Sequence, residues 1–251
     1  MYFCNNYNFS EMTNRPLILV TNDDGITAPG LRTLIKIMNS IGDVVVVAPN
    51  SPQSAMGHAI TINDTIYCKK EKIDDGPQNE YSTSGTPADC VKLAVHELLD
   101  RKPDLCVSGV NHGSNSSVNV VYSGTMSAAI EAGMEGIPAI GFSLLDYNWE
   151  ADFSQIESFI KTITNQVLTQ GLKKGIILNT EYREVRKNSK HIVDFSATNE
   201  KVLSSSKNNP KFKNHFFSNS VFNLDLDGYL DSSLELDLQK VSNEHYLKSY
   251  D

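Results

Sequence analysis

The sequence of 251 residues lacks the features that mark membrane-spanning and disulfide-stabilised proteins. Its four cysteines form no C-x-x-C pair and show no metal-ligand spacing, which favours reduced thiols. No run reaches the ~18 consecutive apolar residues that a membrane span needs, and the N-terminal residues lack the basic and apolar regions of a secretory signal. We therefore expect a cytoplasmic protein that has no membrane partner.

An excess of positive charge is also missing, since 22 Lys and Arg stand against 30 Asp and Glu, a formal net charge of −8. Such a chain has no general attraction for phosphate backbones, so no nucleic acid polymer is expected as its partner. The whole acidic excess lies in residues 1–150, which hold nine Lys and Arg and 17 Asp and Glu. An anionic substrate bound there would need a cation or backbone dipoles beside it.

From Pro16 onward, short β-branched runs alternate with longer helical patterns, which is typical of a parallel sheet covered by helices. The run 44–49 is apolar throughout, so it is predicted to be a central strand that is buried on both faces. Helices are expected to begin near residues 29, 86, 124 and 153, the second running to about residue 100, and segment 58–70 is expected to be extended. The other predicted strands are 17–21, 80–83, 104–111, 137–144, 175–180 and 191–197.

Polar residues follow three of these strands at the edge where parallel sheets bind ligands. The first strand ends in Asn22-Asp23-Asp24-Gly25, the second runs into residues 50–54, and the third ends in residues 108–111. Their carboxylate, hydroxyl and carboxamide oxygens suit Mg²⁺ or Mn²⁺ better than Zn²⁺. Asn-Asp-Asp-Gly is also a good turn sequence, but two adjacent acids after a buried strand repel each other unless a cation lies between them. Either serine of the second segment, Ser51 or Ser54, could join them.

A second candidate element is Tyr122-Ser123-Gly124-Thr125, which stands at the start of a predicted helix. Free N–H groups and the positive end of the helix dipole make such a start a phosphate cradle, although an ordinary Ser/Thr cap is the simpler reading of an isolated motif. Its position after the strand that ends in Asn111 favours the cradle. His58, His112 and Tyr122 are candidates for the acid that protonates a leaving group. Residues 85–89 are explained by a capped helix start.

Five segments in this order and spacing resemble the survival protein E (SurE) family of nucleotidases, over about residues 16–145. The segments are TNDDGITAPGL, VVAPNSPQSAMGHAITI, GTPADCVKLA, PDLCVSGVNHGSN and YSGTMSAAIEAG. The resemblance implies an α/β fold, a three-layer α/β/α Rossmann-like structure with a mostly parallel sheet and a C-terminal extension. It also implies metal-dependent hydrolysis of nucleoside 5′-monophosphates to nucleoside and phosphate, with 3′-nucleotides and short polyphosphate as further candidate substrates.

Carried over by position, the resemblance assigns roles to individual residues. One divalent cation, Mg²⁺ or Mn²⁺, would be held by Asp23, Asp24, Ser54 and Asn111, and the two acids would also be catalytic. The residues implied around the phosphate are Asn22, Asn115, Ser123, Gly124 and Thr125. A homodimer is expected, with a tetramer as the alternative, because residues 227–238 match only faintly the family's C-terminal strand from which tetramers are built. The expected organisation is a disordered extension (1–15), a catalytic domain (16–198), and a C-terminal loop and oligomerisation arm (199–251).

The sequence departs from the family pattern in three places. Residues 50–53 carry no charge, Val118 and Asn119 stand where many relatives have an Asp pair, and residues 227–238 match the family's C-terminal strand only faintly. A non-catalytic module that binds metal and nucleotide is therefore the main alternative. A receiver-like signalling domain is less favoured, because it would need an Asp where Asn111 stands and a Lys after a later strand.

Overall fold

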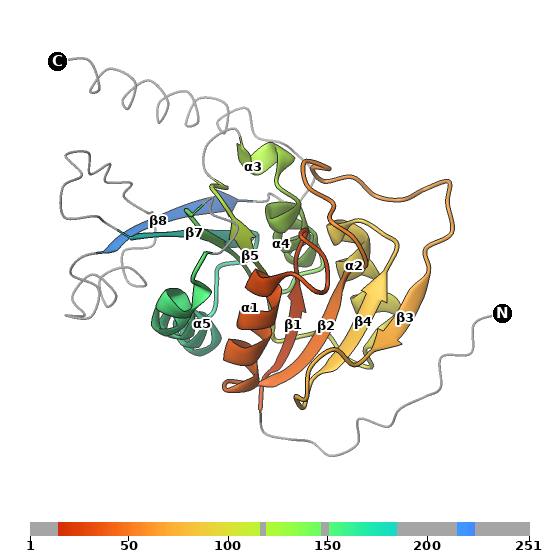
Figure 1. Cartoon of the computed structure of the whole chain (residues 1–251), viewed down its shortest axis with the longest axis horizontal. Coiled ribbons are helices and arrows are strands. Elements are labelled where there is room, and N and C mark those ends of the chain that lie inside the picture. The colour runs from red at the N-terminus through yellow and green to blue at the C-terminus, as the bar shows by residue number, and fades with distance from the viewer. Residues whose placement is uncertain (1–14, 116–118, 147–150, 185–214, 224–251) are drawn as a thin grey trace.

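The computed structural model describes residues 15–115, 119–146, 151–184 and 215–223, and the last of these segments by its backbone alone. Within these residues, eight strands form one sheet in the order β3-β4-β2-β1-β5-β6-β7-β8 (Figure 1). The six central strands are parallel, and the edge strands β3 and β8 are antiparallel to their neighbours. The strands are β1 (Leu17–Thr21), β2 (Asp43–Pro49), β3 (Cys68–Glu71), β4 (Asn79–Thr83), β5 (Leu105–His112), β6 (Ala139–Leu144), β7 (Ile176–Glu184) and β8 (His215–Asn223).

Helices cover both faces of this sheet and make three layers. Alternate residues of β1 point to opposite faces: Ile18 and Val20 join one hydrophobic core, and Leu17 and Leu19 join the other. The first core packs on α1 (Pro29–Asn39), η2 (Phe153–Ile156) and α5 (Glu157–Gln170). The second packs on α2 (Pro87–Leu93), the π-helical turn η1 (Ala94–Leu98) and α4 (Gly124–Met134), while the short α3 (Asn119–Tyr122) leads into α4. Strand β2 is buried along almost its whole length, as its apolar sequence predicts.

The start of α2 has the predicted cap, and one of the capping residues, Asp89, also bonds a second segment of the chain. The Thr86 hydroxyl accepts a hydrogen bond from the Asp89 backbone N–H, and the Asp89 carboxylate accepts one from the Thr86 backbone N–H. The same carboxylate accepts a bond of 2.6 Å from the Thr61 hydroxyl. Asp89 therefore also ties the segment after β2 to the helix.

The structure differs from the sequence-based expectations in the following segments. Segment 58–70 forms a strand only from Cys68 onward, because residues 59 and 61 bond the side chains at the start of α2 instead of a neighbouring strand. The helix expected up to residue 100 changes to π-helical geometry at residue 94. Strand β8, which no pattern predicted, pairs with β7. The predicted strand 191–197, residues 1–14 of the predicted extension and segment 227–238 lie outside the described residues, and the domain boundaries stay predictions.

The order of the strands places a topological switch point between β1 and β5. The chain continues from β1 to β2 and β4 on one side, then returns to β5 and proceeds to β6 and β7 on the other. The helix that follows β1 lies on one face, and α4, which follows β5, lies on the other (Figure 1). Ligands of open α/β sheets bind at the carboxyl ends of the strands at such a point. In the described part of the chain, no helix has the length and apolar character to span a membrane.

Candidate active site

The two acids after β1 lie at the switch point and face different neighbours. Asp23 is only 5% exposed, and its Oδ1 accepts a 2.6 Å hydrogen bond from the Thr125 hydroxyl at the start of α4. Asp24 is half-buried, and its carboxylate accepts a hydrogen bond from the backbone N–H of His112, at the end of β5. The acids thus connect the carboxyl ends of two adjacent strands and the N-terminus of α4.

Gly124 is the residue that lets Asp23 approach the helix so closely. A Cβ atom on Gly124 would lie 2.5 Å from the Asp23 Cβ and 2.9 Å from its Oδ2, closer than real Cβ contacts. The first turn of a helix offers free N–H groups and the positive end of the dipole. The missing side chain at residue 124 therefore keeps the start of α4 in direct contact with the acid.

Both carboxyl groups have raised pKa values. Burial, with the nearby charge of Asp24 as a second cause, raises the pKa of Asp23 from 3.8 to about 6 against the opposing effect of the Thr125 hydrogen bonds. Burial also raises the pKa of Asp24, against the effect of the His112 backbone N–H. The fold thus holds two adjacent acids where ionisation of both is costly, and a bound cation would remove that cost.

This arrangement makes the metal-free protein sensitive to pH. Because the folded state binds the Asp23 proton more tightly than the unfolded chain does, the stabilising contribution of this group falls as the pH rises from about 4 to about 6. Without metal, Asp23→Asn is therefore expected to exceed the wild type in unfolding free energy by on the order of 2–3 kcal/mol above pH 7. Urea unfolding of both proteins in EDTA across pH 4–8 measures this difference. A difference that does not change with pH would contradict the assignment.

The Asn111 side chain has a defined orientation close to the two acids. Its side-chain N–H groups donate to the Asn115 Oδ1 at 3.1 Å and to the Gly113 carbonyl at 3.3 Å. Both hydrogens are thereby directed to protein oxygens, and the Asn111 Oδ1 has no partner among the described residues. The register shift between Ser108 and Asn111, where β5 bulges against β6, accompanies this turn of the strand end. The carboxamide is oriented as an oxygen donor.

Of the residues predicted around the phosphate, Asn22 has a side-chain oxygen that is free among the described residues, whereas the side chains of Asn115 and Ser123 bond other protein groups. Asn22 donates to the Gly25 carbonyl at 3.0 Å, and its buried Oδ1 has no hydrogen-bond partner within the described ranges, so an acceptor is left free next to the acids. Asn115, at 2% exposure, bonds other protein groups with its side chain and its backbone. The Ser123 hydroxyl caps α4 by accepting from the Met126 backbone N–H at 3.1 Å. The side chains of Asn115 and Ser123 thus support the site from within.

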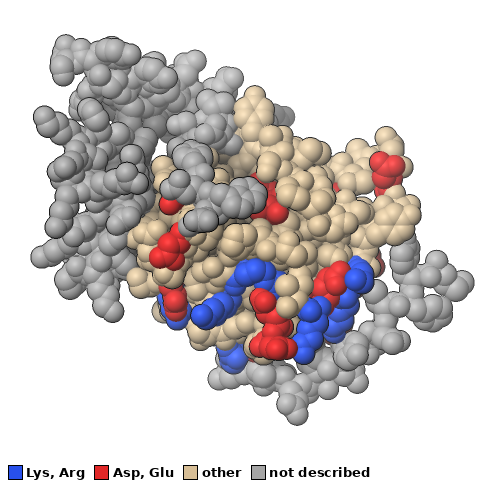
Figure 2. All heavy atoms as spheres, viewed as in Figure 1, with Lys and Arg blue, Asp and Glu red and all other residues tan. Residues whose placement is uncertain are grey.

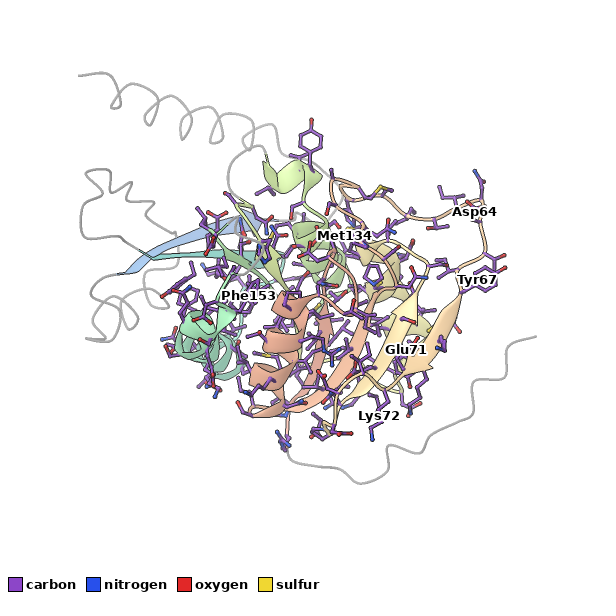
Figure 3. The ribbon with its side chains drawn as sticks, in the orientation of Figure 1. Asp64, Tyr67, Glu71, Lys72, Met134 and Phe153 are labelled. Carbon is purple, nitrogen blue, oxygen red and sulfur yellow. The ribbon has the colours of Figure 1, made fainter. Side chains whose placement is uncertain are left out.

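Ser54 lies on the loop after β2, and its hydroxyl is exposed without a hydrogen-bond partner in the described segments. The loop is tied to the acids one residue earlier, where the Gln53 N–H donates to the Asp23 carbonyl at 2.7 Å. A second tie follows at Gly57, whose N–H donates to the Tyr122 carbonyl at 3.2 Å. Beyond these ties the chain runs outward to Asp64 and Tyr67 (Figure 3). Ser54 is therefore on a tethered loop beside Asp23.

The three candidate leaving-group acids have different surroundings. His58 lies 2.7 Å from Glu131, which follows Thr125 by six residues, or about 9 Å along α4. The His112 ring packs edge-on against Phe153, with ring centroids 4.9 Å apart. Tyr122 is 59% exposed. His58 is thus engaged away from Asp23, and the leaving-group acid stays a prediction.

Several residues that support the site were missed by the sequence analysis. Asn179 and Glu181 on β7 bond the loop after β5, and Ser143 on β6 bonds Asn115. The available signal was a pair of polar residues two apart after the apolar start of the strand, a spacing that places both on one face of the sheet.

The donor set suits a hard divalent cation. In the described segments, no group of three or more His, Cys, Asp and Glu side chains is placed to hold a metal ion, as a zinc site would require. Two carboxylates, the free oxygens of Asn111 and Asn22, and the Ser54 hydroxyl are all oxygen donors. The visible Lys and Arg side chains gather in the lower half of the molecule, toward the ends where the strands begin (Figure 2). On this face, the positive charge that would attract an anion to the acids must therefore come from elsewhere.

Comparison with known proteins decides the family. The family model described as "Survival protein SurE" matches residues 18–205. The chain belongs to the SurE family. Relatives named 5′-nucleotidase SurE include those of Christiangramia forsetii, 66% identical over 173 residues (68% of this chain and 66% of the relative), and Flavobacterium johnsoniae, 67% identical over 168 residues (67% and 65%). The chain therefore spans slightly less than two thirds of the length of these SurE proteins.

A solved SurE structure confirms the predicted fold class. The crystal structure of the SurE protein from Aquifex aeolicus superposes with a TM-score of 0.67 at 27% sequence identity. The alignment covers 89% of this chain and all of the Aquifex chain. The three-layer α/β/α architecture is therefore that of the SurE family.

Proposed function

We propose that this chain is a divalent-metal-dependent phosphomonoesterase that hydrolyses nucleoside 5′-monophosphates to nucleoside and phosphate. The observation that carries the proposal is the contact of a buried acid, Asp23, with the N-terminus of α4 at the switch point of the sheet. One group there can bind a cation and the other an anion. The names of the SurE relatives support the same activity.

Mg²⁺ or Mn²⁺ is the proposed cation, held by Asp23, Asp24, Ser54 and Asn111. The raised pKa values of the two acids and the oriented Asn111 oxygen support this set. When bound, the cation supplies positive charge that polarises a phosphoryl oxygen and lowers the pKa of water.

The chain's own groups supply binding and orientation. The start of α4 stabilises the equatorial phosphoryl oxygens through the positive end of its dipole, because the Thr125 and Met126 N–H groups already bond Asp23 and Ser123. The Thr125 hydroxyl holds the Asp23 carboxylate in place through its 2.6 Å hydrogen bond. The half-buried Asp24 carboxylate orients the attacking water by accepting a hydrogen bond from it.

The purified chain with Mn²⁺ or Mg²⁺ is expected to release phosphate from AMP or GMP. EDTA should abolish the release, and excess metal should restore it, because the oxygen donors bind a hard cation reversibly. A colorimetric phosphate assay measures both steps. Metal-dependent AMP binding without phosphate release would contradict the proposal and favour a non-catalytic module. The homodimer and the cytoplasmic location stay predictions.

A further inference from the structure

Two polar side chains of β7 are buried against the loop that follows β5. Glu181 is 4% exposed, and a single oxygen, Oε1, accepts hydrogen bonds from the Asn115 backbone N–H at 2.5 Å and from the Ser114 hydroxyl at 2.8 Å. Two residues earlier, the Asn179 side chain donates to the Asn115 carbonyl at 3.0 Å. Strand β7 therefore holds the backbone of Asn115 on both its N–H and its carbonyl side.

The side chain of Asn115 connects this backbone clamp to the proposed cation site. Its Oδ1 accepts from the Asn111 side chain at 3.1 Å and from the Ser123 hydroxyl at 2.8 Å, and its Nδ2 donates to the Ser143 hydroxyl at 2.5 Å. The hydrogen bond from Asn111 thus sets which face of the Asn111 carboxamide is turned toward the acids. The hydrogen bond from Ser123 connects Asn115 to the residue that caps α4, where Gly124 and Thr125 contact Asp23.

We propose that Glu181 is a positioning residue for the cation site, acting through Asn115 on Asn111 and on the start of α4. The inference rests on the proposed function, because it concerns the same cation. Both bonds here converge on one buried oxygen, so a single side-chain acceptor holds the Ser114 hydroxyl and the Asn115 N–H. Without that acceptor, the Asn115 N–H is left buried and unpaired, and the loop after β5 shifts to pair it. Residues that hold metal ligands in place influence metal affinity without touching the metal.

The test compares two replacements of Glu181 with a control on the same strand. Glu181→Leu removes the acceptor, whereas Glu181→Gln keeps an oxygen that can accept both bonds. The control is Thr180→Val, since Thr180 is fully buried on the opposite face and donates to the Gly141 carbonyl at 3.0 Å. It removes a buried hydrogen bond that does not lead to Asn115.

Titration of each purified protein with Mn²⁺, followed by the EPR signal of the free ion, measures affinity without substrate. Glu181→Leu is expected to bind Mn²⁺ about 10-fold more weakly than the wild type. Glu181→Gln is expected to stay within about twofold, because it restores the acceptor. Thr180→Val should keep wild-type affinity even where its unfolding temperature falls as far as that of Glu181→Leu.

Three outcomes count against the inference. If Glu181→Leu binds Mn²⁺ as tightly as Thr180→Val, or if Glu181→Gln is as weak as Glu181→Leu, the positioning role is overturned. Asp24→Asn, titrated in parallel, separates this from the proposed function. Weak binding by Asp24→Asn with tight binding by Glu181→Leu overturns the role of Glu181 alone, whereas tight binding by Asp24→Asn overturns the cation site and the inference with it.

Discussion

Asp24→Asn is expected to lower kcat/KM for AMP by ~10³-fold or more, equivalent to about 4 kcal/mol of transition-state stabilisation. The substitution removes one of the two negative charges proposed to hold the cation and the carboxylate proposed to orient the attacking water. The Asn side chain can still accept the hydrogen bond from the His112 backbone N–H, so the fold should be retained. Steady-state phosphate release at saturating Mn²⁺ measures the loss.

Asp104→Asn is the matched control for that measurement. Asp104 is also an acid next to a central strand, and it accepts a 2.7 Å hydrogen bond from the Leu17 N–H. It precedes β5, however, and therefore lies at the amino ends of the parallel strands, opposite the carboxyl ends where Asp24 lies. Its replacement should leave kcat/KM within about twofold, since it lies far from the switch point. Activity in Asp24→Asn equal to that of this control would remove Asp24 from the site.

Gly124→Ala is expected to reduce activity nearly as far, although alanine is the better helix former by about 1 kcal/mol. The added Cβ would lie 2.5 Å from the Asp23 Cβ, so the acid or the start of α4 must move. Either movement breaks the 2.6 Å hydrogen bond from Thr125 and separates the proposed cation site from the helix N-terminus. We expect kcat/KM for AMP to fall by about 10²-fold or more, because displacement of a reacting group by about 1 Å has an effect of this size.

Gly136→Ala is the control that distinguishes a local effect of Gly124→Ala on the site from a general loss of stability. Gly136 has a φ of +75°, and a Cβ atom added there would meet nothing within 4 Å in the described part of the chain, so alanine is strained without a collision. It should lower the unfolding free energy by about 1 kcal/mol and leave kcat/KM unchanged. Wild-type kcat/KM in Gly124→Ala would show that the close approach of Asp23 to α4 is not needed.

The parts of the site that could be predicted from the sequence are local. Asp23 and Asp24 were predicted because they directly follow an apolar strand, and Asn111 because it ends another. Thr86 was predicted as a cap because Pro87 follows it at the first helical position and Asp89 lies in the first turn. Each of these signals lies within a few residues of the chain, where strand direction and helix geometry determine the relation between neighbours.

Other parts depend on residues that are distant in sequence. Glu181 meets Asn115 across 66 positions and His58 meets Glu131 across 73, and no local period links such pairs. His58 was a candidate acid because it stands near the Ser54 loop in the chain. The structure pairs it with a side chain two turns into α4 instead, since the segment after β2 lies along the helices of that face.

The sequence by itself determined the fold class, the SurE resemblance and the oxygen-donor character of the site. The spacing of apolar residues, the residues that end each strand and the type of each side chain are all local properties of the chain. Tertiary structure alone decided which groups touch and how they ionise. The sheet order puts β1 beside β5 and leaves only β6 between β5 and β7. Burial at that junction raises the pKa of Asp23 to about 6, and this depends on how much water the packed neighbours exclude, which no sequence pattern records.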